Sequence, residues 1–581
     1  MQTPTNKSKR LSLFARLGRK SREVVEGGIA RWFGTRHPGP VFMRLTTTFP
    51  WLFYWLTPND RWSLGAHSRA WLGALDMSTG QAGAKPKRIF MFCAYRGQFT
   101  MDFPVAVMLA SLGHSIVFGY LPKLQSPIKP PLADHPSAQL YLRRALSAVE
   151  SISSGRIRCV DLTSTTTETF EPDPDFNRDA LKSDIMMFVQ RETIDLSDPL
   201  VAEASEYFDQ QGKAAYSLAC SYFAKFKDEI DLFVVANGTT FETARFCRAA
   251  QDVGIPVNSY EKFSFRNVRV LTHGGNFQSF DDLRTAWESR ERLGYLEDPF
   301  YSKAAERAAR LLQERKAASL ATWAWALQKA PPQTPVESLA AAGLPDLRRF
   351  VLVCPNIPYD AGYAGLVTVF PSMRAWLVTT VEALLQNSDI DVVVRAHPGE
   401  GSYWAGKESS ADALAQFIGH PRLHFLAHDA NVNTYGLMEA CSFGAVFSST
   451  TGLEMAMLRK TVIVGSEVYY ARKGFTIDTS NPLDYSSKLV ELATLSSTSS
   501  LINHNAKDAQ LFHFILHFVM QWPFPFDKPS GLRSHLLTRY ISHSDLPKYL
   551  PFLEALATSS TEWRSQMSKY ISASNAERFG L

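Results

Sequence analysis

Two segments in the second half of the chain carry residues suited to binding a phosphate. The first, Arg395-Ala396-His397-Pro398-Gly399-Glu400, directly follows an apolar run of strand length. Pro398 disfavours a helical backbone at His397. An imidazole held at a strand end can donate to a phosphate or to a leaving oxygen. The alternative is a turn histidine that only ends a strand. The candidate phosphate-binding residues here are Arg395, His397, Pro398 and Glu400.

The second segment is Ser448-Ser449-Thr450-Thr451-Gly452-Leu453-Glu454. Its hydroxyl residues lie between an expected strand and an expected helix start, where free N–H groups and the helix dipole favour an anion. Gly452 permits close approach of a ligand or of backbone. Ordinary N-capping explains the same residues, and the Gly-Lys-Ser/Thr ending of a Walker loop is missing. With His397, the segment predicts a nucleotide mono- or diphosphate site that includes Ser448, Ser449, Thr450, Thr451, Gly452 and Glu454.

Other polar residues also follow expected strands. Arg472 or Lys473 can offset phosphate charge, although a solvated basic turn explains them equally well. Asp102 and Glu261 are carboxylates that can take a proton or act as nucleophiles. The alternative for each is a helix-start acid or a structural ion-pair partner. The remaining candidates are Arg96, Asn237, Gly238 and Asp360.

Metal and thiol chemistry find no support in the sequence. It contains no HExxH, no CxxC pair, no His/Asp cluster with metal-ligand spacing and no GxSxG elbow. We therefore predict no metal site. The six cysteines are scattered, and we expect buried thiols in a reducing compartment.

Two sets of apolar runs alternate with helix-like stretches, over about 88–261 and 350–464. Continuous apolar strands are typical of a parallel sheet covered on both faces, and the alternation predicts a doubly wound α/β fold. Ligands of such sheets bind at the carboxyl ends of the strands. Two Rossmann-like domains facing a cleft would therefore gather the candidate residues. Residues 137–225 and 484–581 are expected to be mainly helical.

A proline-rich break marks the domain boundary. Pro331-Pro332-Gln333-Thr334-Pro335 ends an Ala-rich helical stretch, and Gly343-Leu344-Pro345 follows. We predict a basic and aromatic arm over 1–80, an N-terminal Rossmann-like domain over 81–335, a C-terminal Rossmann-like domain over 346–515 and a helical tail over 516–581.

The positive charge is concentrated at the N-terminus. Residues 1–36 hold nine Lys/Arg against Glu23 and Glu26, so this arm alone exceeds the whole-chain net charge of +5. The remainder is slightly acidic, which argues against a nucleic-acid-binding body. The sequence shows no secretory signal and no apolar run of the roughly 18 residues that span a bilayer. We expect a cytoplasmic protein whose arm rests on the inner face of the membrane; a disordered arm before a packed helix is the alternative.

Five motifs resemble the capsular polysaccharide biosynthesis proteins, a family that includes β-Kdo transferases acting on lipid-linked acceptors. The His-Pro and Ser-Ser/Thr pair is also similar to that of bacterial sialyltransferases and, more distantly, of CDP-alcohol polymer synthases. The resemblance implies a GT-B fold and a CMP-activated sugar whose phosphate contacts His397, Ser449, Thr450 and Thr451. It rests on residues 356–361, 370–377, 395–400, 448–454 and 470–475.

The resemblance implies a bacterial glycosyltransferase. It would move a sugar from a nucleotide donor to a capsular or other surface polysaccharide or glycolipid, with Asp102 or Glu261 activating the acceptor. The nucleotide-sugar is then a substrate, and no cofactor is expected. The expected partners are the glycan acceptor, the membrane surface and the capsule machinery. Two alternatives stay open: a CDP-alcohol phosphotransferase that makes a phosphodiester-linked polymer, and a non-catalytic partner in capsule assembly or export.

Overall fold

The computed structural model describes residues 85–93, 96–121, 155–262, 268–317, 330–360, 369–401, 408–495, 502–524 and 546–581, with Glu150 and Ser153. The predicted arm over 1–80 lies outside these residues. The chain forms two compact units, the first drawn from 1–167, 224–236 and 525–557 and the second from 168–223, 237–524 and 558–581. Within the described ranges, no helix combines the length and the apolar character needed to cross a bilayer.

Unit 1 contains four parallel strands in the order β4-β1-β2-β3. They are β1 (Arg88–Cys93), β2 (Ser115–Tyr120), β3 (Ile157–Asp161) and β4 (Leu232–Ala236). Helix α6 (Arg96–Ser111) joins β1 to β2 and packs on both. Buried rings support the sheet: Phe90 and Phe233, on adjacent strands, have centroids 5.4 Å apart. The same unit contains α20 (Leu546–Leu556).

Unit 2 begins with α8 (Pro174–Val189) and α9 (Pro199–Phe226), followed by α10 (Phe241–Asp252). A buried ion pair of 2.5 Å between Arg245 and Asp184 ties α10 to α8. Strands β5 (Val257–Glu261), β6 (Val268–His273) and β12 (Gln521–Pro523) pair in antiparallel fashion, with β6 in the middle. Helices α11 (Asp281–Glu288) and α12 (Phe300–Lys316) follow β6, and α21 (Ser560–Ile571) lies near the C-terminus.

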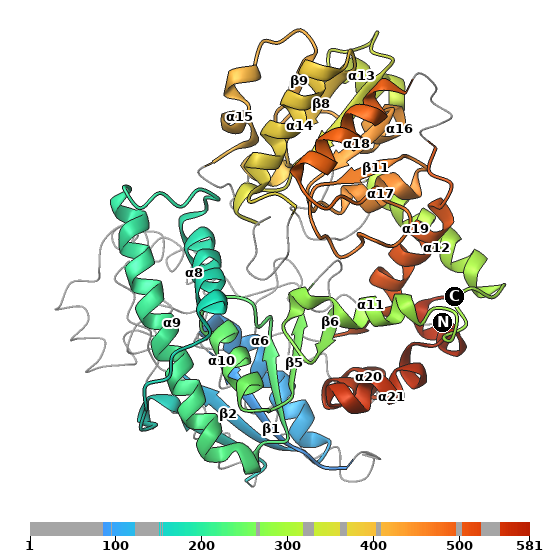
Figure 1. Ribbon diagram of the computed structural model, residues 1–581. Helices are drawn as coiled ribbons and strands as arrows, with labels where there is room; N and C mark the ends of the chain where they lie inside the picture. Colours follow the sequence, from blue (N-terminus) through green and yellow to red (C-terminus); the bar gives the residue numbers. More distant parts are fainter. Residues whose placement is uncertain are drawn as a thin grey trace, which may run out of the picture. The chain divides into compact units, whose positions relative to one another are not determined.

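The second sheet, also in unit 2, is entirely parallel, in the order β11-β10-β7-β8-β9. Its strands are β7 (Phe350–Cys354), β8 (Asp391–Arg395), β9 (Leu423–Leu426), β10 (Phe443–Val446) and β11 (Val462–Val464). Helices α14 (Met373–Asn387) and α18 (Pro482–Thr494) lie side by side over one face, where Trp376 and Tyr485 share a core with Val351 and Val353 (Figure 1).

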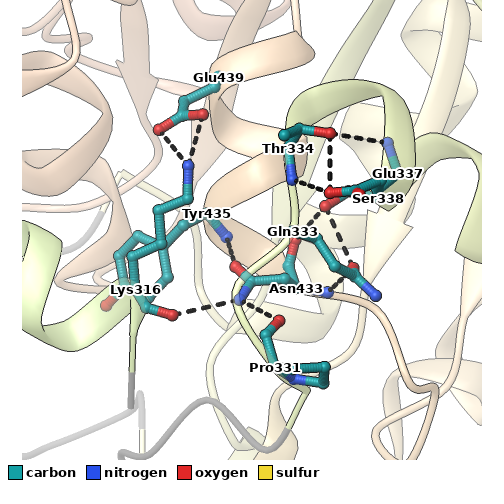
Figure 2. Close-up of polar contacts among 9 residues, drawn as sticks. All are labelled: Lys316, Pro331, Gln333, Thr334, Glu337, Ser338, Asn433, Tyr435 and Glu439. Atoms are coloured by element: carbon teal, nitrogen blue, oxygen red, sulfur yellow. Dashed lines mark hydrogen bonds and ion pairs between the residues drawn. The ribbon is translucent and has the colours of Figure 1, made fainter. Parts of the chain in front are cut away.

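A polar cluster fixes the segment that leads into the second sheet (Figure 2). The Asn433 side chain, which caps α16 (Thr434–Ala440), donates to the backbone oxygens of Lys316 at 3.3 Å and Pro331 at 2.9 Å. The Lys316 ammonium also pairs with Glu439 at 2.8 Å. The end of α12 and the start of α13 (Pro335–Ala341) are thereby held on α16. The predicted proline break is therefore a largely exposed segment that hydrogen bonds hold to α16.

The predicted α/β fold class is confirmed. The second sheet is entirely parallel, whereas strands β5, β6 and β12 pair in antiparallel fashion. The prediction that 137–225 is mainly helical was wrong at β3, and the mainly helical 484–581 also contains β12. Strand β3 lies at the edge of its sheet and carries the charged residues Arg158 and Asp161 among its five, so it lacks the continuous apolar run that marked the central strands. Strand β12 has only three residues, which is too short for a periodic pattern.

Candidate functional site

The candidate site lies where the connections of the second sheet change direction. The chain leaves β7 for β8 and β9 on one side, then returns to β10 and β11 on the other. The carboxyl ends of β7 and β10 therefore flank a topological switch point, the usual ligand position in open α/β sheets. The loops that follow β7, β8 and β10 carry Asn356, His397 and the hydroxyl loop, which we define as Ser448–Thr451.

Hydrogen bonds hold the hydroxyl loop in one conformation. The backbone N–H of Ser448 donates to Asn356 Oδ1 at 3.0 Å, which joins the loops after β10 and β7. The Thr450 hydroxyl lies 3.1 Å from the Tyr469 hydroxyl, and the Tyr470 hydroxyl donates to the Ser449 carbonyl. All four residues of the loop are half-buried. Asn356, Tyr469 and Tyr470 were not among the predicted site residues, although each lies in or beside a motif of the resemblance.

Gly452 has a packing reason for its missing side chain. A Cβ at this position would lie 2.3 Å from the Tyr470 hydroxyl oxygen and 2.7 Å from Val446 Cγ2. The missing side chain of Gly452 therefore leaves room for the Tyr470 hydroxyl. Helix α17 (Thr451–Met457) begins beside it, and the Thr450 side chain makes no capping hydrogen bond to the helix.

His397 follows β8 and is half-buried. Its Nδ1 accepts a hydrogen bond from the Gly399 N–H at 3.0 Å. This bond assigns the proton of the neutral imidazole to Nε2, which is then a donor. Burial, assisted by the charge of Arg395, lowers the pKa of His397 to about 4. At neutral pH the ring is therefore an uncharged N–H donor.

Arg395 and Glu400 flank His397 in the sequence, and their side chains bond to other residues of the chain. The buried Arg395 guanidinium donates to the carbonyl oxygens of Ala427 and Ala430, and burial lowers its pKa. Glu400 accepts from the Ser410 hydroxyl at 2.6 Å, and burial raises its pKa. These hydrogen bonds of Arg395 and Glu400 hold the backbone on either side of His397. Pro398 begins the short helical turn Pro398–Gly401.

Glu454 lies on α17 and is buried. It forms an ion pair of 2.6 Å with Arg315 of α12 and accepts from the Tyr435 hydroxyl at 3.2 Å. The pair is largely shielded from water, since the side chains of Arg315 and Glu454 are 17% and 6% exposed. Glu454 therefore links three helices behind the hydroxyl loop.

The basic residues after β11 differ from each other. Arg472 is exposed, has a left-handed backbone with φ +57°, and pairs with Glu467. Lys473 is half-buried, and burial lowers its pKa. Asp360 ends the short turn after β7, and its side chain lies outside the described residues.

The structure brings two predicted residues of the N-terminal half together. Asn237 directly follows β4, and its Nδ2 donates to Glu261 Oε2 at 2.8 Å. Asn237 and Gly238 both have left-handed backbones, with φ +65° and +77°. The Asn237 Oδ1 accepts from the Thr239 N–H at 2.9 Å, which fixes the amide orientation. Glu261 ends β5 and is partly exposed.

The other two predicted residues belong to unit 1. Asp102 is a residue of α6, and its side chain is only 1% exposed. Arg96 begins the same helix, and its side chain lies outside the described residues. Among the residues that the structure describes, no cluster of three His, Cys, Asp or Glu side chains is arranged to hold a metal ion. Burial raises the pKa of Cys354 and Cys441 to about 12.

Residues 302–496 match the family model described as capsule polysaccharide biosynthesis protein. Over this segment, which contains the second sheet and its loops, the resemblance stated above is confirmed. None of the curated proteins matches the chain.

The similar solved structures share little sequence with this chain. Thermosulfurimonas dismutans KpsC, a beta Kdo 2,4 transferase, is 18% identical over 47% of this chain and 82% of its own, with a TM-score of 0.31. A glycosyltransferase from Rickettsia africae is 10% identical over 82% of this chain and 100% of its own, with a TM-score of 0.25. The UDP-GlcNAc 2-epimerase of Methanocaldococcus jannaschii is 10% identical over 74% of this chain and 99% of its own, also with a TM-score of 0.25.

Proposed function

We propose that the protein is a glycosyltransferase that moves a sugar from a nucleotide donor, CMP-linked by the resemblance, to a capsular polysaccharide or glycolipid acceptor. The observation that carries this proposal is that Asn356, His397 and the hydroxyl loop follow the carboxyl ends of three adjacent strands, β7, β8 and β10, of a sheet that lies inside the capsule-family match. A neutral N–H donor and several hydroxyl groups at the same edge of a sheet suit the oxygens of a phosphate without a permanent counter-charge.

In this proposal, His397 acts on the leaving group. The bond between the anomeric carbon and the phosphate oxygen breaks as the acceptor oxygen bonds to that carbon, and the nucleoside phosphate departs. The Nε2–H of His397 donates to the departing phosphate, whose negative charge grows in the transition state. The hydroxyls of Ser449, Thr450 and Thr451 supply further donors.

We assign Glu261 as the general base that takes the proton of the acceptor hydroxyl. A general base has to reach the hydroxyl that it deprotonates, and Glu261 is partly exposed whereas Asp102 is buried. Asn237 donates to one carboxylate oxygen and the Lys262 N–H to the other at 2.6 Å, so the carboxylate has a fixed orientation. The proton moves from the acceptor hydroxyl to this carboxylate as the new glycosidic bond forms.

Product analysis tests the proposed reaction. The protein is incubated with CMP-activated sugars and a capsular oligosaccharide acceptor, and the products are weighed by mass spectrometry. Gain of one sugar residue with release of the nucleoside phosphate supports the proposal. Gain of a phosphate-bridged unit from a CDP-alcohol would replace it with phosphotransfer.

Variants then separate the roles. Glu261→Gln keeps the shape of the side chain but has one acceptor oxygen in place of two, so it keeps only one of the two hydrogen bonds and removes the base. We expect turnover to fall by about a hundredfold or more with nucleotide affinity retained. Asp102→Asn is the matched control, and its turnover should stay near that of the wild type. Loss of turnover in Asp102→Asn with full activity in Glu261→Gln would reverse the assignment.

A further inference from the structure

The Tyr469 ring connects the hydroxyl loop to a distant part of the sequence. Its hydroxyl lies 3.1 Å from Thr450 Oγ1, so it bonds directly to the loop. Its ring stacks on Phe280, with centroids 4.9 Å apart and planes inclined by 29°. Phe280 precedes α11 and follows the antiparallel strand β6, outside the sheet that carries the hydroxyl loop.

Phe280 has a backbone that aromatic residues rarely adopt. Its φ of +48° and ψ of +25° lie in the left-handed region, where the side chain of a non-glycine residue crowds the backbone. Such a conformation persists only where surrounding contacts hold it, and it is concentrated at functional sites. A glycine would satisfy this backbone without strain, but it would leave Tyr469 without the ring of Phe280.

Residues 276–280 also contact the part of the proposed site that contains Asn237 and the Glu261 carboxylate. The N–H of Phe277 donates to the Asn237 carbonyl at 3.0 Å, and the Asn237 side chain in turn holds Glu261. The rings of Phe277 and Phe280 lie 5.4 Å apart. The five residues 276–280 therefore touch Asn237 at one point and Tyr469 at another.

A second aromatic contact anchors the other end of α11. Trp287 packs edge-on against Phe512, with centroids 5.3 Å apart, and against Phe475 at 6.1 Å. Phe475 closes the loop that begins at Tyr469, and Phe512 also stacks on Tyr469 with centroids 6.4 Å apart. Helix α11 is thus held against residues 469–475 at both of its ends, which fixes the position of Phe280.

We infer that Phe280 is a positioning residue: by stacking on Tyr469, it holds the hydroxyl loop from the segment that also fixes Asn237 and Glu261. Phe280 then fixes the position of the hydroxyl loop relative to Asn237 and Glu261. This inference rests on the proposed function for its catalytic meaning, while the mechanical coupling of Phe280 to the loop stands on the contacts themselves.

Hydrogen exchange tests the coupling without any ligand. Backbone exchange of the peptide covering 448–453 is compared in the wild type, Phe280→Ala, Phe280→Gly and Phe280→Tyr. Both variants without a ring should exchange this peptide faster, and Phe280→Tyr should restore wild-type protection. Phe280→Gly removes the left-handed strain that Phe280→Ala keeps, so it should melt at a higher temperature than Phe280→Ala while exchanging equally fast. Unchanged exchange in both ringless variants would overturn the inference.

Nucleotide binding tests the consequence for the proposed site, with CMP as the probe. Phe280→Gly and Tyr469→Phe should each bind CMP about fivefold more weakly or worse, and Phe280→Tyr like the wild type. Tyr301→Phe is the control, because it deletes a half-buried hydroxyl that bonds to Asp508 instead. Normal CMP affinity in Phe280→Gly would contradict the inference. A wild type that binds no nucleotide defeats the proposed function, while the exchange result still decides the coupling.

Discussion

The backbone N–H of Ser448 donates to the Asn356 side chain across the switch point of the second sheet, at a distance of 3.0 Å. This bond joins the loops of two neighbouring parallel strands, β10 and β7. Asn356 therefore fixes the start of the hydroxyl loop.

The variants Asn356→Ala and Asn356→Asp separate the effect of losing the hydrogen bond to the Ser448 N–H from the effect of an added negative charge. Alanine leaves the Ser448 N–H without its acceptor, so we expect a loss of about 1 kcal/mol of stability together with weaker nucleotide binding. Aspartate keeps an acceptor but adds a negative charge near the proposed phosphate, so stability should stay close to that of the wild type while binding falls. Urea unfolding and calorimetric titration measure the two effects. Equal nucleotide affinity in all three proteins would remove Asn356 from the site.

His397→Asn and His397→Gln test the assigned tautomer. Asparagine retains an acceptor near Nδ1 for the Gly399 N–H but has no donor at the Nε2 position, so we expect a stable protein that binds nucleotide roughly tenfold more weakly or worse. Glutamine places a donor near Nε2 but loses the Gly399 contact, so it should bind better than asparagine and unfold more easily. The reverse order of stabilities would show that Nδ1 does not hold the loop.

The depressed pKa of His397 predicts a pH dependence. The folded-state pKa, about 4, lies below the unfolded value of about 6.5, so the unfolded state binds the proton first as the pH falls. The wild type should therefore lose stability relative to His397→Asn between pH 6.5 and pH 4, because the other buried groups are common to both proteins. Melting temperatures of the two proteins across this range measure the difference. A constant difference would mean an unperturbed imidazole.

The sequence predicted the parallel strands and the two motif loops because a continuous apolar run identifies a strand covered on both faces, and a polar segment after it marks the carboxyl end. It predicted Glu261 and Asn237 separately, but their 2.8 Å contact depends on strand order, which local patterns do not encode. Phe280, which acts through packing, gave no signal, because an aromatic residue in a loop resembles any core residue. Tyr470 lies within a motif of the resemblance, but its sequence context did not indicate the contact with Gly452.

Gly452→Ala should destabilise the protein by about 1–3 kcal/mol, since the added methyl group would meet the Tyr470 hydroxyl at 2.3 Å. The double variant with Tyr470→Phe removes that oxygen, so its cost should be smaller than the sum of the two single costs. Urea denaturation of the four proteins completes the cycle. Strict additivity would show that Tyr470 is not what Gly452 accommodates.

The buried pair of Arg315 and Glu454 should be sensitive to loss of one partner. Arg315→Met leaves a buried carboxylate without its cation, so we expect a loss of roughly 3–5 kcal/mol, and the double variant with Glu454→Met should recover much of it. The exposed pair of Arg178 and Asp175 is the control, where Arg178→Met should cause no measurable change. Urea unfolding is the measurement; an Arg315→Met variant as stable as the control would contradict the buried-pair account.

Nucleotide binding is the first measurement to make, because it reports on His397 itself. The wild type, His397→Asn and His424→Asn are compared in a thermal-shift titration with CMP, CDP, UDP, GDP and ADP. His424 is the control because it lies within β9 and contacts Asp391 at the start of β8, away from the carboxyl ends. A nucleotide at a hundred times its Kd stabilises a protein by about 2.7 kcal/mol, which such a titration resolves. We predict a shift with CMP in the wild type and in His424→Asn that is largely lost in His397→Asn. No shift with any of the five nucleotides, or an equal shift in all three proteins, would contradict this prediction.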